Sequence, residues 1–234
     1  MLMTRFEKTL YKANKDPLNL LDTSFGLSTY VPLDLSIQNE EIRKVAISDP
    51  FQCQMYIDTI LKKKKGKVAY GGYLEKRNLY KDHTGFDNPE GKSRNIHLGI
   101  DLWAKEGTEV ITPIDGKLHS FKNNAIKGDY GPTMILEHTL ENTVFYSLYG
   151  HLSVKSLKGL YVGKVFKKGD LLASLGDPSI NVHYAPHLHF QIIGDIGTYY
   201  GDYPGVCSLE ELAYYAKNCP NPNYLLKVDP INTD

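Results

Sequence analysis

The segment HYAPHLHFQI, residues 183–192, places three of the chain's eight histidines within seven positions. In an extended strand, residues two apart share a face, so His187 and His189 would project together while Leu188 and Phe190 face the other side. Two imidazoles on one face could bind a metal ion or transfer a proton. Two histidines on a solvated strand would give the same pattern, so the pair indicates a site only if further ligands occur elsewhere.

A second segment, RNIHLGIDLW, offers such ligands about ninety residues upstream. His97 and Asp101 are four apart, and Gly99 between Ile96 and Ile100 favours an extended or looped chain over a helix. Both side chains could lie on one face. With one histidine of the first segment, they would supply two nitrogens and one carboxylate oxygen.

Three nitrogen and oxygen ligands leave the fourth tetrahedral position open, which is typical of a catalytic zinc site. A two-histidine, one-carboxylate iron site would use the same ligand types. Hydrolysis at such a site also needs a general base and a group that stabilises the oxyanion. The chain has no His-Glu pair, so the H-E-x-x-H arrangement of helical zinc peptidases is excluded, and spare histidines such as His151 in LYGHLS are the candidates.

The segments HLGID, YGHLS and PHLHF, in this order, resemble the H-x-x-x-D, Y-x-H-L and H-x-H-F motifs of the lysostaphin-type zinc metallopeptidases (LytM-like, peptidase family M23). The segments GTEVITPIDGKL and GKVFKKGDLLASLG strengthen the resemblance, which covers about residues 94–193. It implies an antiparallel β-sheet scaffold and one zinc ion per chain in a groove. It also implies hydrolysis of a peptide bond in peptidoglycan stem or crosslink peptides or in muropeptides.

The resemblance also implies a role for each motif residue. His97, Asp101 and His189 would bind the zinc ion, and His187 and His151 would be the base and the transition-state stabiliser. Further candidates would line the substrate groove: Arg94, Tyr149 and His183.

Other functions remain open beside the zinc peptidase. The segments GGYLEKRNLY, HLGIDLWAKEGTEV and GDYPGVC are similar to a metallopeptidase-like module of some aminotransferase fusion proteins, which would imply an intracellular substrate outside the cell wall. A non-hydrolytic binding or regulatory module on the same fold would be indicated by a lost ligand, and none is lost. A biotinyl or lipoyl carrier barrel would need a modified lysine at a hairpin tip and would not use the ordered histidines and aspartate.

The sequence predicts a mainly β protein, α+β overall, with helical additions at both ends. Residues 1–68 form an N-terminal helical extension, 69–195 the β domain and 196–234 a C-terminal loop and helix. The N-terminal helix should begin at Asp49 and Pro50, bury Phe51, Met55 and Ile60 on one face, and stop at Gly66.

Turn residues and a second capping motif complete the expected elements. Strands or hairpins should have Asp115-Gly116 and Lys168-Gly169 at their tips. Ser208 with Glu211 should open a helix that runs to about Asn218.

Composition limits the partners and the compartment. Lysine plus arginine and aspartate plus glutamate number 27 each, so no net field attracts nucleic acid. No segment has the length of a membrane span, and charges interrupt the first residues where a secretory signal would be apolar. With three cysteines expected to be free thiols, these features predict a cytoplasmic protein, or a periplasmic or extracellular one if it is exported by another route. The oligomeric state is left open.

Overall fold

The computed structural model describes residues 3–22, 24–77, 93–126, 128–180 and 184–230. The strands are β1 (Tyr30–Pro32), β2 (Val68–Gly71), β3 (Ile96–His97), β4 (Ile100–Trp103), β5 (Glu109–Ile111), β6 (Gly116–Asn124), β7 (Gly131–Leu140), β8 (Thr143–Gly150), β9 (Val165–Phe166), β10 (Leu171–Ser174), β11 (His187–Ile193) and β12 (Val206–Cys207). The α-helices are α1 (Arg5–Lys12), α2 (Pro50–Lys64), α3 (Leu212–Asn218) and α4 (Asn223–Leu226). Short 3₁₀ helices lie at Leu27–Thr29, Ile42–Lys44 and Val154–Leu157.

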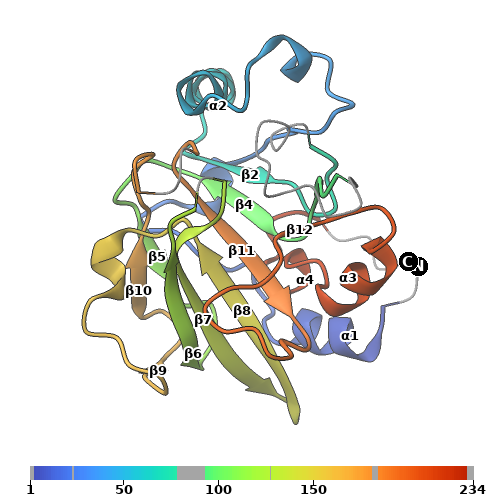
Figure 1. Cartoon of the computed structure of the whole chain (residues 1–234), viewed down its shortest axis with the longest axis vertical. Coiled ribbons are helices and arrows are strands. Elements are labelled where there is room, and N and C mark those ends of the chain that lie inside the picture. The colour runs from blue at the N-terminus through green and yellow to red at the C-terminus, as the bar shows by residue number, and fades with distance from the viewer. Residues whose placement is uncertain (1–2, 23, 78–92, 127, 181–183, 231–234) are drawn as a thin grey trace.

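The central feature is an eight-stranded sheet with the order β1-β2-β4-β11-β8-β7-β6-β9. Its neighbouring strands are antiparallel, except that β1 runs parallel to β2. Two further antiparallel pairs, β10 with β5 and β12 with β3, flank this sheet (Figure 1). The expected mainly β fold with a large antiparallel sheet and helices toward both ends of the chain is confirmed.

The N-terminal region does more than add a helix, because β1 extends the central sheet beside β2. The amide of Leu33 continues this pairing by donating to the carbonyl oxygen of Tyr70. Helix α1 begins with a capping box, in which Thr4 and Glu7 bond to each other's backbone amides, and it packs against α4. The first 68 residues therefore contribute a strand and two helices, where the sequence predicted one helix.

Helix α2 begins where the sequence predicts, with the Asp49 side chain accepting from the Gln52 amide and Pro50 in the first turn. The predicted apolar face is wrong for Phe51 and Met55. Phe51 and Met55 are 68% and 51% exposed, and the helix buries Cys53 and Ile57 instead. Of the three predicted residues, Ile60 alone packs against this buried cluster, as a partly buried side chain. The error arose because the apolar residues of this helix surround its axis, so their spacing did not select one stripe.

The turn predictions succeeded in part. The segment TMILEHTLENTVFYSLY forms the hairpin β7–β8, whose turn residues Glu141 and Asn142 both have positive φ, as a tight two-residue hairpin turn requires. Asp115-Gly116 and Lys168-Gly169 are not hairpin tips. They carry the chain between two sheets, because β5 pairs with β10 while β6 pairs with β7 and β9.

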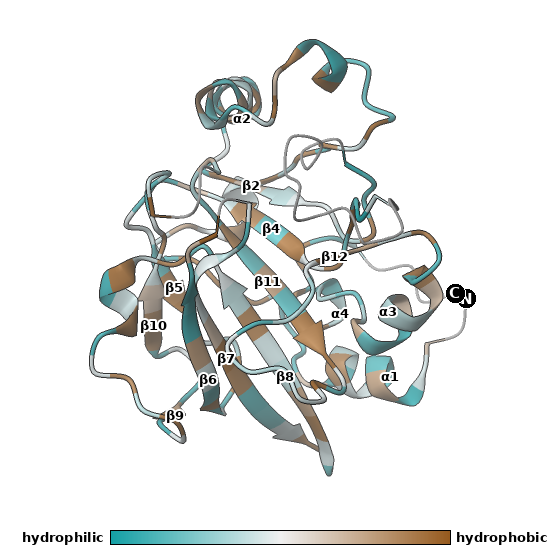
Figure 2. Ribbon diagram, in the orientation of Figure 1, coloured by the Kyte–Doolittle hydropathy of each residue, from teal (hydrophilic) through white to brown (hydrophobic). Residues whose placement is uncertain are grey.

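The sheet packs on both faces, which explains why β11 is buried at every position. Its residues Leu188, Phe190 and Ile192 point into the main core with side chains of β4, β7 and β8. The alternating residues His187, His189 and Gln191 face the opposite side. Figure 2 shows hydrophobic segments on both β4 and β11, the central pair that positions the site.

The C-terminal helix begins later than the sequence predicts. Ser208 and Glu211 do interact, since the Ser208 amide and hydroxyl both donate to the Glu211 carboxylate, but α3 starts only at Leu212. This pair therefore stabilises the turn before the helix. Among the described residues, no helix has the length and apolar character needed to cross a membrane.

Candidate metal centre and groove

Strand register brings the two histidine-bearing segments together. β11 pairs with β4 so that His189 lies opposite Asp101 and His187 lies opposite Trp103. His97 ends β3, and Gly99 lies between it and the ligand on β4. A Cβ at position 99 would lie 2.7 Å from the His189 ring, so glycine is required for this close approach.

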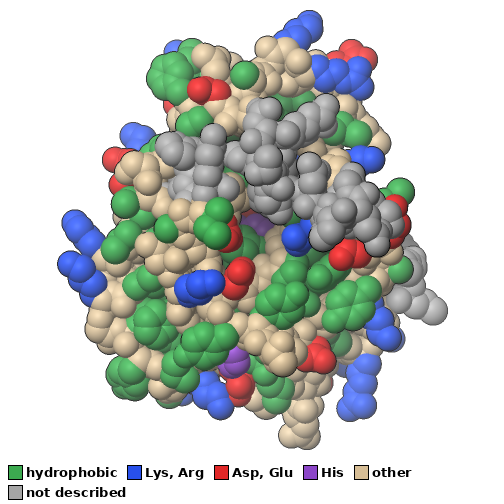
Figure 3. All heavy atoms as spheres, in the orientation of Figure 1, with side chains coloured by type: hydrophobic (Ala, Val, Ile, Leu, Met, Phe, Trp, Pro, Cys, Tyr) green, Lys and Arg blue, Asp and Glu red, His purple; other side chains and the backbone are tan. Residues whose placement is uncertain are grey.

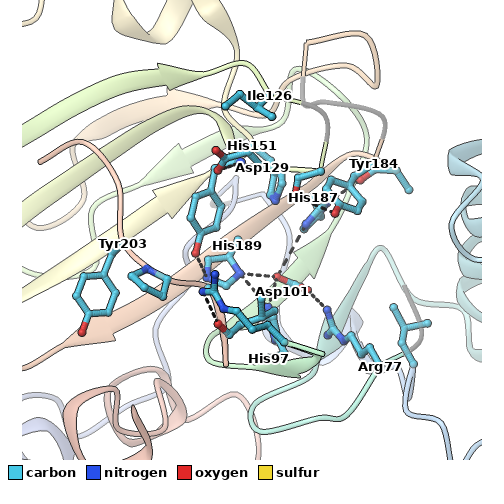
Figure 4. Close-up of a pocket in the computed structure, with 18 of the residues that line it drawn as sticks. Arg77, His97, Asp101, Ile126, Asp129, His151, Tyr184, His187, His189 and Tyr203 are labelled. Atoms are coloured by element: carbon cyan, nitrogen blue, oxygen red, sulfur yellow. Dashed lines mark hydrogen bonds and ion pairs between the residues drawn. The ribbon is translucent and has the colours of Figure 1, made fainter. Parts of the chain in front are cut away.

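His97, Asp101 and His189 converge in one buried cluster (Figure 4). The His97 Nε2 atom lies 2.9 Å from His189 Nδ1, and each of these nitrogens lies 3.2 Å from Asp101 Oδ1. Ligands bound tetrahedrally at the usual zinc distances are about 3.3 Å apart. The three atoms therefore form a triangle of nearly the size that one small cation requires.

The outer ring nitrogens define the proton positions. His97 Nδ1 donates to the carbonyl oxygen of Gly72 at 2.9 Å, and His189 Nε2 donates to Gln191 Oε1 at 2.9 Å. In the neutral tautomers, the inner nitrogens then carry lone pairs and no proton. Two nitrogen lone pairs and a carboxylate oxygen meet at one point, which is unfavourable without a cation and suits a divalent metal.

Gln191 is held in the orientation that this tautomer needs. Its Nε2 donates to the Pro204 carbonyl oxygen at 3.1 Å and to Cys219 Sγ at 3.3 Å, so its Oε1 faces His189. The sequence analysis did not identify Gln191. Its position two residues after His189 is a signal that could have found it, since alternate strand residues share a face.

The electrostatics favour an ionised Asp101 carboxylate and a neutral His97 imidazole. Burial, with the Arg77 charge, lowers the pKa of His97 to about 4. Burial alone would raise the pKa of Asp101, but the nearby His97 and Arg77 outweigh it and hold that pKa well below its usual value. These are the protonation states that metal ligands require.

His187 and His151 lie beside this triangle and not in it. His187 Nδ1 donates to the Ala185 carbonyl oxygen at 2.7 Å, and its Nε2 lies 3.9 Å from Asp101 Oδ1. The ring centroids of His187 and His151 are 4.1 Å apart. Burial lowers the pKa of His187, and burial together with the neighbouring His187 holds the pKa of His151 well below its usual value. Both are therefore neutral near pH 7.

These histidines open onto a cavity of about 390 Å³, which is a size usual for ligand sites. One wall is apolar and includes Leu35, Ile47 and Cys53 from the N-terminal region. The other wall includes Asp129 and Tyr203, with Ile126 above them in Figure 4. Only small areas of histidine surface are visible on the face shown in Figure 3, in keeping with the burial of the centre.

The predicted groove residues have different outcomes. Arg94 lines the cavity, where its Nη2 donates to the Val206 carbonyl oxygen at 2.8 Å. Tyr149 does not line it: this side chain is fully buried in the main core, because it lies on the sheet face opposite His189. His183 lies outside the described residues. Cys53, Cys207 and Cys219 are buried free thiols and are not part of the ligand cluster.

Arg77 is a further residue that the sequence analysis missed. Its guanidinium donates to Asp101 Oδ2 at 2.5 Å, and its side chain is 1% exposed. No spacing rule connects Arg77 with the ligand motif, since the two are brought together by the antiparallel bridge of Lys76 with Ile96 and by the Arg77 amide, which donates to the Asn95 carbonyl oxygen.

A buried triangle of two imidazoles and one carboxylate, with more histidines at the edge of a cavity, is the kind of centre that metal-dependent hydrolases use. Comparison with known proteins agrees with this class. Residues 95–199 match Peptidase family M23, so this segment of the chain is similar to M23 peptidases. The match includes all five of the predicted ligand and catalytic residues and excludes Arg77.

Individual relatives match only in part. An uncharacterized metalloprotease of Haemophilus influenzae (strain ATCC 51907 / DSM 11121 / KW20 / Rd) is 34% identical over 95 residues, which are 41% of this chain and 18% of that protein. The structure of LytU is 23% identical, with 67% of this chain and 90% of that chain covered and a TM-score of 0.40. The catalytic domain of the antimicrobial peptidase lysostaphin from Staphylococcus simulans is 22% identical, with 62% and 87% covered and a TM-score of 0.37. The family and the curated relative support a metallopeptidase.

Proposed function

We propose that this protein is a zinc-dependent metalloendopeptidase with one zinc ion per chain, bound by His97, Asp101 and His189. The observation that carries the proposal is the triangle of inner ligand atoms, 2.9–3.2 Å on a side, into which three lone pairs point. Three nitrogen and oxygen ligands leave the fourth coordination position of the zinc ion open for a reacting molecule, as in catalytic zinc sites. The M23 match supports the choice of peptide hydrolysis.

Bound zinc would lower the pKa of a coordinated water to about 7 and polarise the scissile carbonyl group. His187 is the base in this proposal. Its Nδ1 donates to the Ala185 carbonyl oxygen, so its Nε2 carries a lone pair and no proton. This Nε2 atom lies 3.9 Å from Asp101 Oδ1. A neutral imidazole with a free lone pair is the form that can accept a proton.

His151 is placed to stabilise negative charge on the substrate. Its backbone lies in the left-handed region with a φ of 60°, and its amide donates to the Tyr130 carbonyl oxygen at 2.8 Å. Within the described residues, the buried His151 Nδ1 has no hydrogen-bond partner. A substrate group in the cavity would supply the partner that such a buried polar atom needs.

The substrate in this proposal is a peptide of the bacterial cell wall, in a stem, a crosslink or a muropeptide. The support is the M23 match together with the three ordered motifs. The cavity suits a short peptide because its lining combines apolar residues such as Leu35 and Ile47 with the charged residues Asp129 and Arg94.

The test combines metal analysis with cleavage. The protein, purified without added zinc and then loaded, is incubated with purified muropeptides and with an unrelated peptide of equal length, and the products are weighed by mass spectrometry. We expect about one zinc per chain and new termini only in the muropeptides. Zinc binding with no cleavage of either peptide would favour a non-hydrolytic binding module, and cleavage of the unrelated peptide alone would favour a substrate outside the cell wall.

A further inference from the structure

The segment from Gly72 to Arg77, which follows β2 and precedes the M23 match, contacts two of the three ligand residues. We propose that this segment, called here the ligand clamp, fixes the positions of His97 and Asp101 and thereby sets the affinity for the metal. The inference rests on the proposed zinc site. It adds Arg77, Glu75 and Gly72 as positioning residues outside the family segment.

The clamp holds Asp101 by one carboxylate oxygen. Arg77 Nη1 donates to Oδ2 at 2.5 Å, while Oδ1 lies 3.2 Å from the inner nitrogen of each histidine. A charge-assisted hydrogen bond of this length restricts rotation of the carboxylate. Only Oδ1 then faces the ligand triangle.

The clamp holds His97 through the backbone. The Gly72 carbonyl oxygen accepts from His97 Nδ1 at 2.9 Å, which fixes the ring and its tautomer. The His97 amide donates to the Glu75 carbonyl oxygen, and the Leu74 amide donates to the His97 carbonyl oxygen, at 3.0 and 2.8 Å. One short segment therefore orients both the main chain and the imidazole of this ligand.

The position of the guanidinium is itself fixed from three sides. Arg77 Nε donates to Glu75 Oε2 at 2.5 Å, and the guanidinium carbon lies 5.7 Å from the centre of the Trp103 ring. A Cβ at Gly72 would lie 1.8 Å from Arg77 Nη2, and Gly72 has a φ of 104°. Glycine at position 72 therefore leaves the space that the arginine occupies.

The net charge beside the proposed metal site depends on Glu75 as well as on Arg77. A lone guanidinium beside Asp101 would oppose binding of a cation to that carboxylate. Glu75 offsets the positive charge of Arg77, so Glu75, Arg77 and Asp101 together keep a net negative charge. The second Glu75 oxygen accepts from the Leu35 amide at 2.9 Å, which connects the clamp to the N-terminal region.

The test measures zinc affinity by competition with a chelating indicator, together with thermal unfolding of the metal-free protein. The variants are Arg77→Met, Arg77→Lys and Gly72→Ala, in the full chain. Loss of a residue that orients a metal ligand usually lowers metal affinity by about 10 to 100-fold, and we expect Arg77→Met to lie in this range. Excess zinc should restore one equivalent per chain, which a misfolded variant would not allow.

The other two variants distinguish the effect of ligand positioning on zinc affinity from the effects of charge and of misfolding. Arg77→Lys keeps the positive charge but cannot reach Asp101 and Glu75 with a planar fork, so its affinity should stay closer to that of Arg77→Met than to wild type. Gly72→Ala keeps every charge and should also weaken binding by about 10-fold or more. Arg43→Met is the matched control, because Arg43 is exposed and, among the described residues, its guanidinium donates only to the Ile37 carbonyl oxygen at 3.3 Å. This variant should bind zinc as wild type does.

Wild-type affinity in Arg77→Lys would show that charge alone matters and would overturn the clamp, as would unchanged affinity in Gly72→Ala. These two variants decide the matter if Arg77→Met does not fold. A wild-type protein that binds no zinc would overturn the proposed function. A zinc-binding wild type whose clamp variants bind equally well would overturn the clamp and leave the proposed function intact.

Discussion

His187 and His189 share one face of β11 but should respond differently to replacement by alanine. His189 is one of three inner ligand residues, with Nδ1 at 2.9 Å from His97 Nε2. His187 lies outside the triangle, with Nε2 at 3.9 Å from Asp101 Oδ1 and Nδ1 held by Ala185. We therefore expect zinc content and turnover to fall together at position 189 and to separate at position 187.

The expected losses of zinc affinity and turnover follow from the positions of the two histidines. His189→Ala removes a direct ligand and leaves Gln191 Oε1 without its donor, so the loss of zinc affinity should exceed the roughly 100-fold upper range for indirect partners. His187→Ala leaves the triangle intact, and its zinc affinity should stay within about threefold of wild type. Its turnover should fall by about 100 to 10,000-fold, which is about 2.7 to 5.4 kcal/mol in the activation barrier.

The assay measures bound zinc and the rate of peptide cleavage for each variant in the same preparation. His119→Ala is the matched control, since His119 lies on β6 beside Ser120 and does not line the cavity. It should change neither quantity. Loss of zinc in His187→Ala as complete as in His189→Ala would refute the division of roles, and both histidines would then be ligands.

Three further outcomes are expected. Zinc at 100 times its dissociation constant should stabilise the protein by about 2.7 kcal/mol and raise its melting temperature by roughly 5–11 °C, compared with protein kept in a chelator. An unchanged melting temperature would argue against a zinc site in the folded protein. Gly99→Ala should lower the free energy of unfolding, measured by urea denaturation, by about 1–3 kcal/mol and should reduce zinc binding, because the new Cβ would lie 2.7 Å from His189 and from the Phe190 carbonyl oxygen. Gly26→Ala is the control: its Cβ would lie 3.7 Å from the nearest atom, so neither quantity should change. Burial lowers the pKa of His138 to about 4, so as the pH falls the unfolded chain binds a proton at this histidine before the folded chain does. About 3 kcal/mol of the free energy of unfolding should therefore be lost between about pH 6.5 and pH 4. His138→Gln should flatten that part of the stability profile, and an unchanged slope in urea titrations would contradict this.

The sequence predicted the parts of the site that depend on local spacing. Residues two apart on a strand share a face, which placed His187 with His189, and the ordered motifs added His97, Asp101 and His151. Arg77 and Gly72 could not be found in this way. They reach the ligands because β2 pairs with β4 and because the chain after β2 pairs with the segment before His97, through the Lys76–Ile96 bridge. Pairing over such distances leaves no periodic signal in the sequence.

The fold was predicted to a similar extent. Strand positions followed from apolar alternation and turn residues, and the β7–β8 hairpin follows that pattern. Local signals did not reveal which strands pair. Asp115-Gly116 and Lys168-Gly169 have the chemistry of hairpin tips, yet tertiary packing uses them to move the chain between sheets. Tyr149 was misplaced because strand alternation would put it on the same face as His151, whereas β8 ends at Gly150 and His151 has a positive φ of 60°.

The pairing of β2 with β4 also determines how much chain a working fragment must contain. A piece cut at the boundaries of the M23 match, 95–199, would lack β2, which covers one side of β4, and β12, which pairs with β3. The main-chain groups of β4 at Asp101 and Trp103 would become an open sheet edge, and such edges promote association between chains. Fragments meant for crystallisation or for grafting onto other proteins should therefore begin before Tyr30 and extend beyond Cys207.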